Sequence, residues 1–402
     1  MMCGQTDAPA IRTKLYRTRQ STLVITTRRT PPPTTEAATV SRQTAISAAS
    51  DTEMSDTELS TAASEQFPRQ TPRAHGAEGA DTPRITLTIR DLEEPTLRRV
   101  KQLGIDHVCM SGLPIPWTEG DVRERMDRLA EYGLSLSNMM MAGFPNAIYG
   151  RPDRDQDIDK VLQTIRAAGA CGLPVVEYNF YAHRIVEGYY EAPGRGGATL
   201  TAFDYERIKD LPPLPEEGAH TMDEMWDNVT YFLKAIVPVA EESGVRLALH
   251  PNDPPAPISR GSEQIMGSVE GWKRLVDIVP NPHNGITFDC GVTREMGQDP
   301  VEVCRYFGER DQINHVHFRN VRTHIPRELY TEVFIDEGEV DMFAVMKELV
   351  RQKYPRLVYP EHPPEMDADR DHPDSGISSG RYTGFAYTVG YGRAMLQAAL
   401  AS

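Results

Sequence analysis

Several features that would direct the interpretation elsewhere are missing from this sequence. It has no run of about 18 apolar residues, which is the length that a helix needs to cross a membrane. It also lacks an excess of basic residues, because 43 Lys and Arg stand against 58 Asp and Glu, a formal net charge of −15. An acidic chain is repelled by nucleic acid and by anionic lipid. Neither nucleic acid nor a membrane is therefore an expected partner.

Cysteines are few and scattered. The five are Cys3, Cys109, Cys171, Cys290 and Cys304; their number is odd and none form a Cys-x-x-Cys pair. This pattern is typical of a reduced intracellular protein and not of a disulfide framework. We therefore expect a cytoplasmic protein.

The first 82 residues differ in composition from the rest. They are rich in Thr, Ser, Ala, Pro and Arg and have little periodic apolar content, which predicts a disordered arm. Within residues 1–50, seven basic residues face two acidic ones, a net charge of +5. That composition also occurs in organellar transit peptides. A tail without function, a translation start at Met54 and a targeting segment remain as alternatives.

From Arg84 onward, short apolar strands alternate with helical segments. Strands are expected at 85–89, 106–110, 134–140, 175–180, 245–250, 285–289, 313–317 and 356–361. Helices are expected near 92–103, 119–132, 155–171, 222–243, 266–278, 341–353 and 385–400. Eight such units predict an α/β fold of the (β/α)8 TIM-barrel type over residues 83–402, with an insertion at 181–220 over the barrel mouth. A doubly wound open sheet is the alternative, but no Gly-x-Gly-x-x-Gly turn supports it.

Four consecutive predicted strands end in residues that can bind a metal: His250, Asp289, His317 and Glu361. In a TIM barrel the C-terminal strand ends form the active site. A lone histidine or carboxylate at a strand end is usually structural, so the prediction depends on their joint occurrence at successive strands. Two imidazoles and two carboxylates suit a divalent ion, and we expect Mn²⁺, with Mg²⁺, Fe²⁺ or Co²⁺ as alternatives.

Two neighbouring residues compete with these ligands. Cys290 follows Asp289 directly, but adjacent strand residues point to opposite faces, which favours Asp289. His315 shares a face with His317 and lies deeper in the barrel, where we expect it to support the site by hydrogen bonding.

Candidate acid–base and substrate-binding groups lie beside the predicted ligands. His362, at the strand mouth, is a candidate catalytic residue, as is Tyr387 or a neighbouring tyrosine, although packing is the ordinary role of a tyrosine. Arg319 is expected to take part in catalysis and to bind a substrate carboxylate in bidentate fashion. Tyr178 and Asn179 end the fourth strand, where we expect them to hydrogen-bond substrate hydroxyls.

Several segments together resemble the mannonate dehydratase family, a member of the xylose-isomerase-like TIM barrels. They are His250–Pro255, Asn284–Phe288, His315–Val321 and Gly338–Lys347, and Val176–Phe180 also fits. The resemblance covers roughly residues 85–400 and is closest over 246–362.

This resemblance implies a divalent-metal lyase, usually Mn²⁺-dependent, that acts in hexuronate catabolism. Such an enzyme removes water from D-mannonate and gives 2-keto-3-deoxy-D-gluconate. The family's histidine ligands correspond to His250 and His317, its catalytic histidine to His362, and its late tyrosine to Tyr387 or a neighbour. A sugar acid is therefore the expected small-molecule partner, and a homo-oligomer is the expected assembly.

Two positions depart from the family pattern. The usual cysteine ligand is replaced by Asp289, and the family's Pro-Asp-His-Gly is Pro360-Glu361-His362-Pro363 here. Both changes move the site toward the Asp/His/Glu ligands of sugar isomerases and epimerases. Isomerisation or epimerisation of a ketose or keto acid is thus the alternative to dehydration of a sugar acid. A non-enzymatic binding barrel is a third reading, but the retention of every ligand-capable strand end argues against it.

Overall fold

The computed structural model describes residues 79–111 and 113–402. The predicted disordered arm, over 1–82, lies outside the described residues except for its last four. Within the described ranges, no helix combines the length and the apolar character that a membrane crossing requires.

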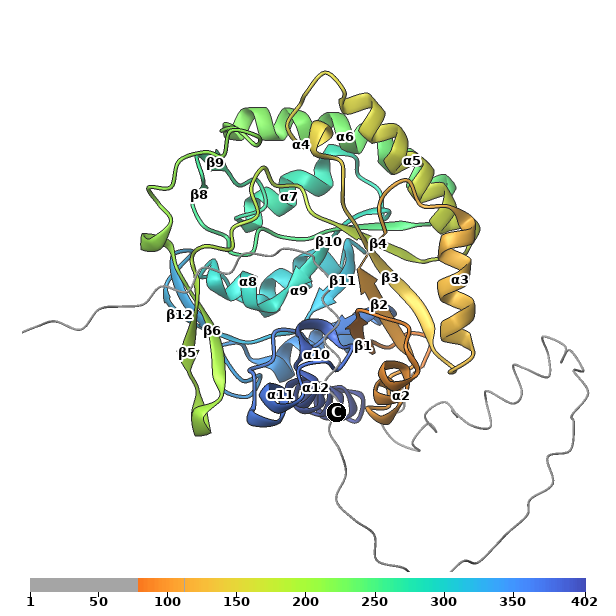
Figure 1. Cartoon of the computed structure of the whole chain (residues 1–402), viewed down its shortest axis with the longest axis vertical. Coiled ribbons are helices and arrows are strands. Elements are labelled where there is room, and N and C mark those ends of the chain that lie inside the picture. The colour runs from red at the N-terminus through yellow and green to blue at the C-terminus, as the bar shows by residue number, and fades with distance from the viewer. Residues whose placement is uncertain (1–78, 112) are drawn as a thin grey trace, which may run out of the picture. The chain divides into compact units, whose positions relative to one another are not determined.

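Eight parallel strands close into a barrel in the order β1-β14-β11-β10-β7-β4-β3-β2 (Figure 1). These strands are β1 (Arg84–Ile89), β2 (His107–Ser111), β3 (Ser135–Met141), β4 (Val175–Tyr178), β7 (Arg246–Leu249), β10 (Asn284–Asp289), β11 (Ile313–His317) and β14 (Leu357–Tyr359). They are the eight strands that the sequence predicts, so the TIM-barrel prediction is confirmed. β14 ends earlier than expected, at Tyr359, because Pro360 has no N–H to donate to a neighbouring strand.

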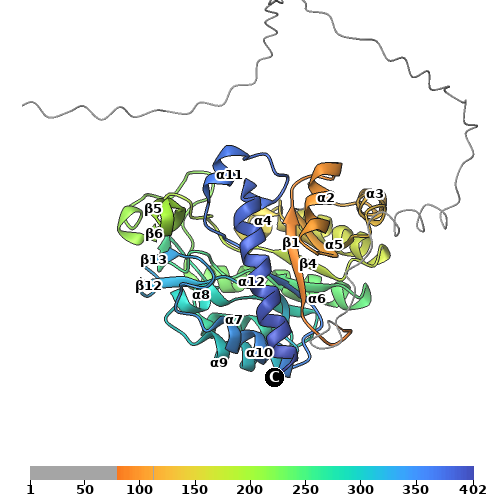
Figure 2. The same ribbon diagram turned by 90° about the horizontal axis from the view of Figure 1, so that it is seen from below.

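Helices surround the barrel (Figure 1). They are α2 (Glu94–Gln102), α3 (Glu119–Ala130), α4 (Pro145–Ile148), α5 (Arg154–Ala170), α6 (Met222–Glu242), α7 (Val269–Ile278), α8 (Cys290–Glu295), α9 (Pro300–Gly308), α10 (Met342–Arg351), α11 (Asp367–Asp371) and α12 (Tyr382–Leu400). The seven expected helices are present, and α4, α8, α9 and α11 are additional. Figure 2 shows that α12 packs beside β1, so the last helix completes the ring.

A four-stranded antiparallel sheet lies outside the barrel sheet, in the order β12-β13-β6-β5. The hairpin of β5 (Tyr189–Pro193) and β6 (Thr199–Asp204) belongs to the insertion that follows β4. β12 (Val321–Ile325) and β13 (Leu329–Glu332) follow the C-terminal end of β11. The sheet therefore joins loops from two different barrel strands. A smaller hairpin, β8 (Ile258–Ser259) with β9 (Ser262–Glu263), follows β7.

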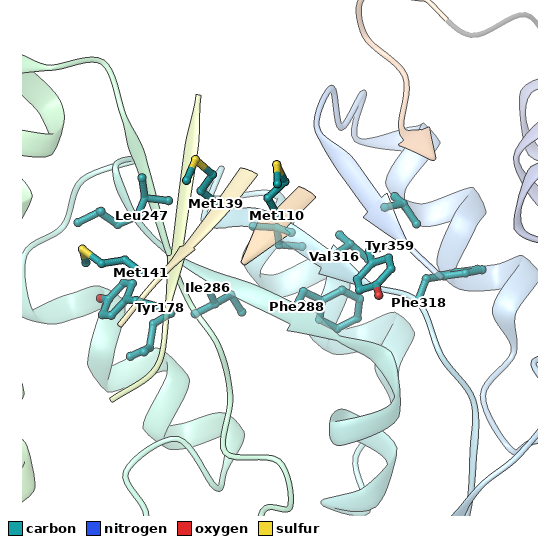
Figure 3. Close-up of a cluster of buried hydrophobic side chains, with 14 of the residues drawn as sticks. Met110, Met139, Met141, Tyr178, Leu247, Ile286, Phe288, Val316, Phe318 and Tyr359 are labelled. Atoms are coloured by element: carbon teal, nitrogen blue, oxygen red, sulfur yellow. The ribbon is translucent and has the colours of Figure 1, made fainter. Parts of the chain in front are cut away.

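Side chains on the barrel strands separate into an apolar and a polar set. Ile286, Phe288 and Val316 are fully buried among other apolar side chains (Figure 3). Burial of one such side chain contributes roughly 1.5–3 kcal/mol to stability. The residues next to them in sequence, such as Thr287 and His315, are polar and equally buried. Because strand residues alternate between faces, the polar set is left facing the barrel interior.

Strand register brings the predicted site residues to one level. Asp289 pairs with His317 between β10 and β11, and His317 pairs with Tyr359 between β11 and β14. Glu361 follows two residues after Tyr359. The strand ends therefore converge at the C-terminal mouth of the barrel.

Candidate metal and active site

A cavity of about 530 Å³ opens at this mouth. Three of the four predicted ligands, His250, His317 and Glu361, line it, and so do His362 and Asn179. The fourth, Asp289, is fully buried next to them. The insertion contributes Tyr181, Arg184, Tyr189 and Thr201 to the cavity wall.

His250, Asp289, His317 and Glu361 present one ligand-capable atom each within 4.8 Å of one another. His317 Nδ1 lies 3.1 Å from His250 Nε2, 2.8 Å from Glu361 Oε1 and 3.8 Å from Asp289 Oδ2. Donors bound to one ion at about 2.2 Å lie within about 4.4 Å of one another. Small side-chain movements would therefore suffice for all four to hold one divalent ion.

Contacts at the outer ring nitrogens orient the two histidines so that His250 Nε2 and His317 Nδ1 face each other within the cluster. His250 Nδ1 lies 2.7 Å from the Pro251 carbonyl oxygen, so its N–H donates there and Nε2 is left to the site. His317 Nε2 lies 3.3 Å from Glu177 Oε1, which leaves Nδ1. Metal-binding histidines are typically oriented in this way by a carbonyl or a carboxylate. The buried Oε1 of Glu361 receives no hydrogen bond from the described residues, which also fits a cation ligand.

Glu177, on β4, has a supporting position that the sequence analysis missed. Its carboxylate accepts hydrogen bonds from Asn138 Nδ2 at 3.0 Å and Thr287 Oγ1 at 2.8 Å. Burial raises the pKa of Glu177, but the imidazoles of His317 and His315 outweigh this and hold it below its usual range. The negative charge therefore stays beside His317. A carboxylate within the apolar segment Val175–Tyr178 was the available signal.

Arg319 corrects a prediction. Its guanidinium is buried and donates to Asp289 Oδ2 at 3.0 Å, Glu295 Oε1 at 2.6 Å and Asp253 Oδ2 at 3.1 Å. Burial lowers the pKa of Arg319, but these carboxylates raise it well above its usual value. The side chain does not line the cavity. Arg319 is thus not placed to bind a substrate carboxylate or to take part in the chemistry; it holds the loops around the site together.

Asp289 is the most constrained of the four candidate ligands. Its Oδ1 accepts the backbone N–H of Val292 at 2.8 Å, which caps helix α8, and its Oδ2 accepts from Arg319. Complete burial raises its pKa. Cys290, the competing residue, lies in the hydrophobic core, where burial raises the pKa of its thiol well above the usual value. β10 ends at Asp289 and Cys290 opens helix α8, so of the two only Asp289 presents a ligand-capable atom to the cluster.

His315 lies deeper in the barrel, with its ring centroid 5.0 Å from that of His317. Neither ring nitrogen has a hydrogen-bond partner among the described residues, so the predicted supporting hydrogen bond is absent there. Burial lowers the pKa of His315 to about 4, so the ring is neutral at pH 7.

His362 lies on the cavity wall, as the acid–base prediction requires. Its backbone is left-handed, with φ of 47°, and turns the ring toward Glu332, whose Oε1 is 2.9 Å from Nδ1. Burial lowers the pKa of His362, but the carboxylates of Glu332 and Glu361 raise it to about 10. Asp253, Glu332 and His362 form another group with the spacing of metal ligands, as do Glu177, His315 and His317.

Two predicted tyrosines lie away from the cavity. The Tyr178 ring is buried in the helix layer, 5.9 Å from that of Phe232 on α6 (Figure 3). Since Glu177 faces the barrel interior, its neighbour Tyr178 must face outward, so the predicted hydrogen bond to substrate is wrong. The Tyr387 ring packs 5.8 Å from that of Phe334 and does not line the cavity, which is against a catalytic role.

Other tyrosines lie at the cavity instead of Tyr178 and Tyr387. Tyr181, Tyr189 and Tyr359 line the cavity. The Tyr189 hydroxyl donates to Asp253 Oδ1 at 2.9 Å, and burial raises its pKa well above the usual value. Tyr189 belongs to the insertion, where no barrel-strand pattern pointed to it.

Comparisons with known proteins agree with this architecture. The model of the family described as D-mannonate dehydratase (UxuA) matches residues 90–401. A mannonate dehydratase of Thermotoga petrophila is 28% identical over 337 residues, which cover 73% of this chain and 92% of that protein. The crystal structure of the mannonate dehydratase from Streptococcus suis serotype 2 matches with a TM-score of 0.70 and 28% identity, over 79% of this chain and 96% of that one.

A more distant match concerns the fold alone. A xylose isomerase-like TIM barrel protein from Mycobacterium smegmatis matches with a TM-score of 0.51 and 15% identity, over 80% of this chain and 100% of that one. The family model, by contrast, covers more than half of the chain, and the sequence resemblance is thereby confirmed. The chain belongs to the D-mannonate dehydratase (UxuA) family of carbon–oxygen hydro-lyases.

Proposed function

We propose that this protein removes water from D-mannonate, or from a closely related sugar acid, to give 2-keto-3-deoxy-D-gluconate or its counterpart. The reaction depends on a divalent cation, and Mn²⁺ is the expected one. The observation that carries the proposal is the convergence of His250, Asp289, His317 and Glu361 beside a 530 Å³ cavity. A six-carbon acid fits a cavity of that size.

The donor set supports the cation. Two imidazole nitrogens are oriented toward the cluster, and Glu361 Oε1 is a buried acceptor without a donor among the described residues. Such a mixture of nitrogen and oxygen ligands suits Mn²⁺ and related ions. A bound divalent cation supplies Lewis acidity toward substrate oxygens and stabilises the negative charge that develops when the proton next to the carboxylate leaves.

The remaining chemistry falls to acid–base groups on the cavity wall. Dehydration needs one group to take the proton from C2 and another to protonate the hydroxyl that leaves C3. His362 is the first candidate, because it lines the cavity and its Nδ1 lies 2.9 Å from Glu332 Oε1. Tyr189 replaces Tyr387 as the second, because its hydroxyl lies on the same cavity and is held by Asp253.

The test uses the full chain with D-mannonate. The metal content of the purified protein is measured, and 2-keto-3-deoxy product is detected by periodate–thiobarbiturate colour. We expect EDTA to abolish product formation and Mn²⁺ to restore it. His250→Gln should lose both metal and activity, whereas His324→Gln, which changes an exposed histidine, should keep both. Full activity after complete removal of the metal contradicts the proposal.

A second candidate function rests on one observation. Asp289 and Glu361 both belong to the ligand cluster, and the sequence resemblance implies a cysteine and an aspartate at these positions, so the site has the Asp/His/Glu donors expected of sugar isomerases and epimerases. That reaction shares proton removal next to a carbonyl but needs no leaving group. Conversion of a ketose or keto acid without loss of water, in protein that is inactive on D-mannonate, would favour it.

A further inference from the structure

The charges on the cavity wall are unbalanced. Glu177, Asp253, Glu332 and Glu361 all line it. The only arginines or lysines among its lining residues are Arg184 and Arg381, neither of which is paired with a carboxylate of the described residues. A sugar acid brings a further negative charge into this acidic cavity, and its carboxylate needs a cationic partner. Arg319 cannot serve, because three buried carboxylates already occupy it.

Arg381 lies close to the proposed acid–base group. It precedes helix α12, is partly buried, and donates from Nη1 to the Pro363 carbonyl oxygen at 2.9 Å. Pro363 directly follows His362 in the chain. The guanidinium is therefore fixed beside the backbone of the residue that is proposed to act on C2 or C3. In a sugar acid the carboxylate is bonded directly to C2, the carbon that loses the proton. A carboxylate bound by Arg381 would therefore hold C2 close to His362.

The loop that carries Arg381 is attached to the barrel. Arg90 N donates to the Gly376 carbonyl oxygen at 2.8 Å, and Ile377 forms a β-bridge with Ile89 at the end of β1. Ser378 and Ser379, which follow, line the cavity. The Ser379 hydroxyl donates to the Ser378 carbonyl oxygen at 2.7 Å, so its proton is already engaged. The loop thus presents the Arg381 guanidinium from a fixed position, which lowers the entropic cost of binding an anion.

The N-terminus of α12 is not the source of this anion site. Asp369 already accepts the backbone N–H groups of Thr383 and Gly384, at 2.6 Å and 3.1 Å. The positive charge offered to the cavity at this point is therefore the Arg381 guanidinium itself.

We propose that Arg381 binds the substrate carboxylate and thereby restricts the enzyme to sugar acids. The identity of the bound acid rests on the proposed function. The expectation that Arg381 binds an anion does not, because it follows from a guanidinium on the cavity wall that has no carboxylate partner among the described residues. Bidentate pairing of a guanidinium with a carboxylate also fixes the orientation of C2 relative to His362.

Arg184 provides a matched comparison. It follows β4, whereas Arg381 follows β14, and three strands separate β4 from β14 in either direction around the barrel. Arg184 therefore lies across the cavity mouth from Arg381. It is exposed, and no hydrogen bond fixes its guanidinium among the described residues. The same substitution at these two sites changes the same charge on opposite walls of one cavity.

The experiment measures binding and not turnover, so every protein compared carries His362→Gln, which should keep the metal and slow the proposed dehydration. Isothermal titration calorimetry of the full chain, with MnCl₂ present, compares D-mannonate with D-mannitol, which has the same carbon chain without the carboxylate. We expect Arg381→Gln to weaken D-mannonate binding roughly 10- to 100-fold, as for the loss of a charge-assisted contact, and to leave D-mannitol binding unchanged. Arg381→Lys should recover part of the loss, and Arg184→Gln should bind D-mannonate as the His362→Gln protein alone does.

Two results would overturn the assignment. One is a His362→Gln protein that binds D-mannonate no more tightly than D-mannitol. The other is a loss of D-mannonate affinity in Arg184→Gln and not in Arg381→Gln. Thermal unfolding of each variant, together with its D-mannitol binding, shows that the fold is intact. If Arg381 proves necessary for D-mannonate binding but the wild type forms no 2-keto-3-deoxy product, the carboxylate site stands and the proposed dehydration fails.

Discussion

Replacing Arg319 with methionine separates a structural role from a substrate-binding role. The substitution keeps an unbranched side chain but removes a buried guanidinium bonded to Asp289, Glu295 and Asp253 at 2.6–3.1 Å. Removal of one partner of a buried ion pair costs about 3–5 kcal/mol, because the other charge stays buried without compensation. Burial raises the pKa of Asp289 and of Glu295, so both carboxylates can neutralise themselves by binding protons. We therefore expect a loss near the lower figure.

That loss is large enough to measure. With about 2–4 °C for each kcal/mol in a domain of this size, 3 kcal/mol lowers the melting temperature by roughly 6–12 °C. Circular dichroism in EDTA follows unfolding without the contribution of a bound metal. Arg322→Met is the matched control, since Arg322 is exposed on β12 and, among the described residues, donates only to the Glu337 carbonyl oxygen at 3.2 Å. Adding Glu295→Leu to Arg319→Met should restore part of the stability, because it removes a carboxylate left unpaired.

The opposite pattern would refute the reasoning about Arg319. If Arg319→Met has the same melting temperature as Arg322→Met, and only its KM for D-mannonate rises, then the Arg319 guanidinium binds substrate as the sequence suggests. The buried ion pairs would in that case contribute little to the fold.

Three further variants test the site. Glu177→Gln weakens the orientation of His317 and should lower Mn²⁺ affinity about 10- to 100-fold in a titration followed by electron paramagnetic resonance; unchanged affinity would exclude a supporting role. His362→Gln should reduce kcat by about 10²- to 10⁴-fold with metal content retained, and a kcat like that of the wild type would remove His362 from the mechanism. Tyr387→Phe should leave kcat near the wild-type value, because its ring packs on Phe334 outside the cavity; a large loss of kcat would return it to the catalytic site.

The barrel could be predicted because its signals are local. Each strand is a short apolar run followed by a helix, and the rule that TIM-barrel sites form at C-terminal strand ends then places His250, Asp289, His317 and Glu361 together. The extra helices carried signals too. Asp299 caps α9 and Pro300 opens it, which is a recognisable helix start. The start of α9 is therefore visible in the sequence alone.

Side-chain direction explains one failure. Glu177 and Tyr178 are adjacent in β4, so only one of them can face the barrel interior. On the sequence alone, the alternation of strand residues between the two faces of the sheet favours Asp289 over Cys290. The same alternation favours Glu177 over Tyr178 as the residue that faces the barrel interior. This error was avoidable from the sequence.

Long-range pairing explains the others. Arg319 follows β11, but its partners Asp253 and Glu295 follow β7 and end α8, and no periodicity reports that these loops meet. Tyr189 reaches the cavity because the β5–β6 hairpin pairs, through β6, with β13, a contact between segments more than 100 residues apart. Such pairings depend on the tertiary fold and have no signature in either segment alone.

The excess of carboxylates around the site bears on both the proposed divalent cation and the proposed role of Arg381 in binding the substrate carboxylate. Asp253, Asp289, Glu295 and Glu361 surround Arg319, and one guanidinium cannot neutralise all of them. The excess negative charge favours a divalent cation at the strand ends, where Glu361 Oε1 accepts no hydrogen bond from the described residues. With Arg319 engaged inside the protein, recognition of an anionic substrate passes to a cation on the outer wall of the cavity. A buried arginine beside metal-ligand candidates is therefore poor evidence for substrate binding until its own carboxylate partners have been identified.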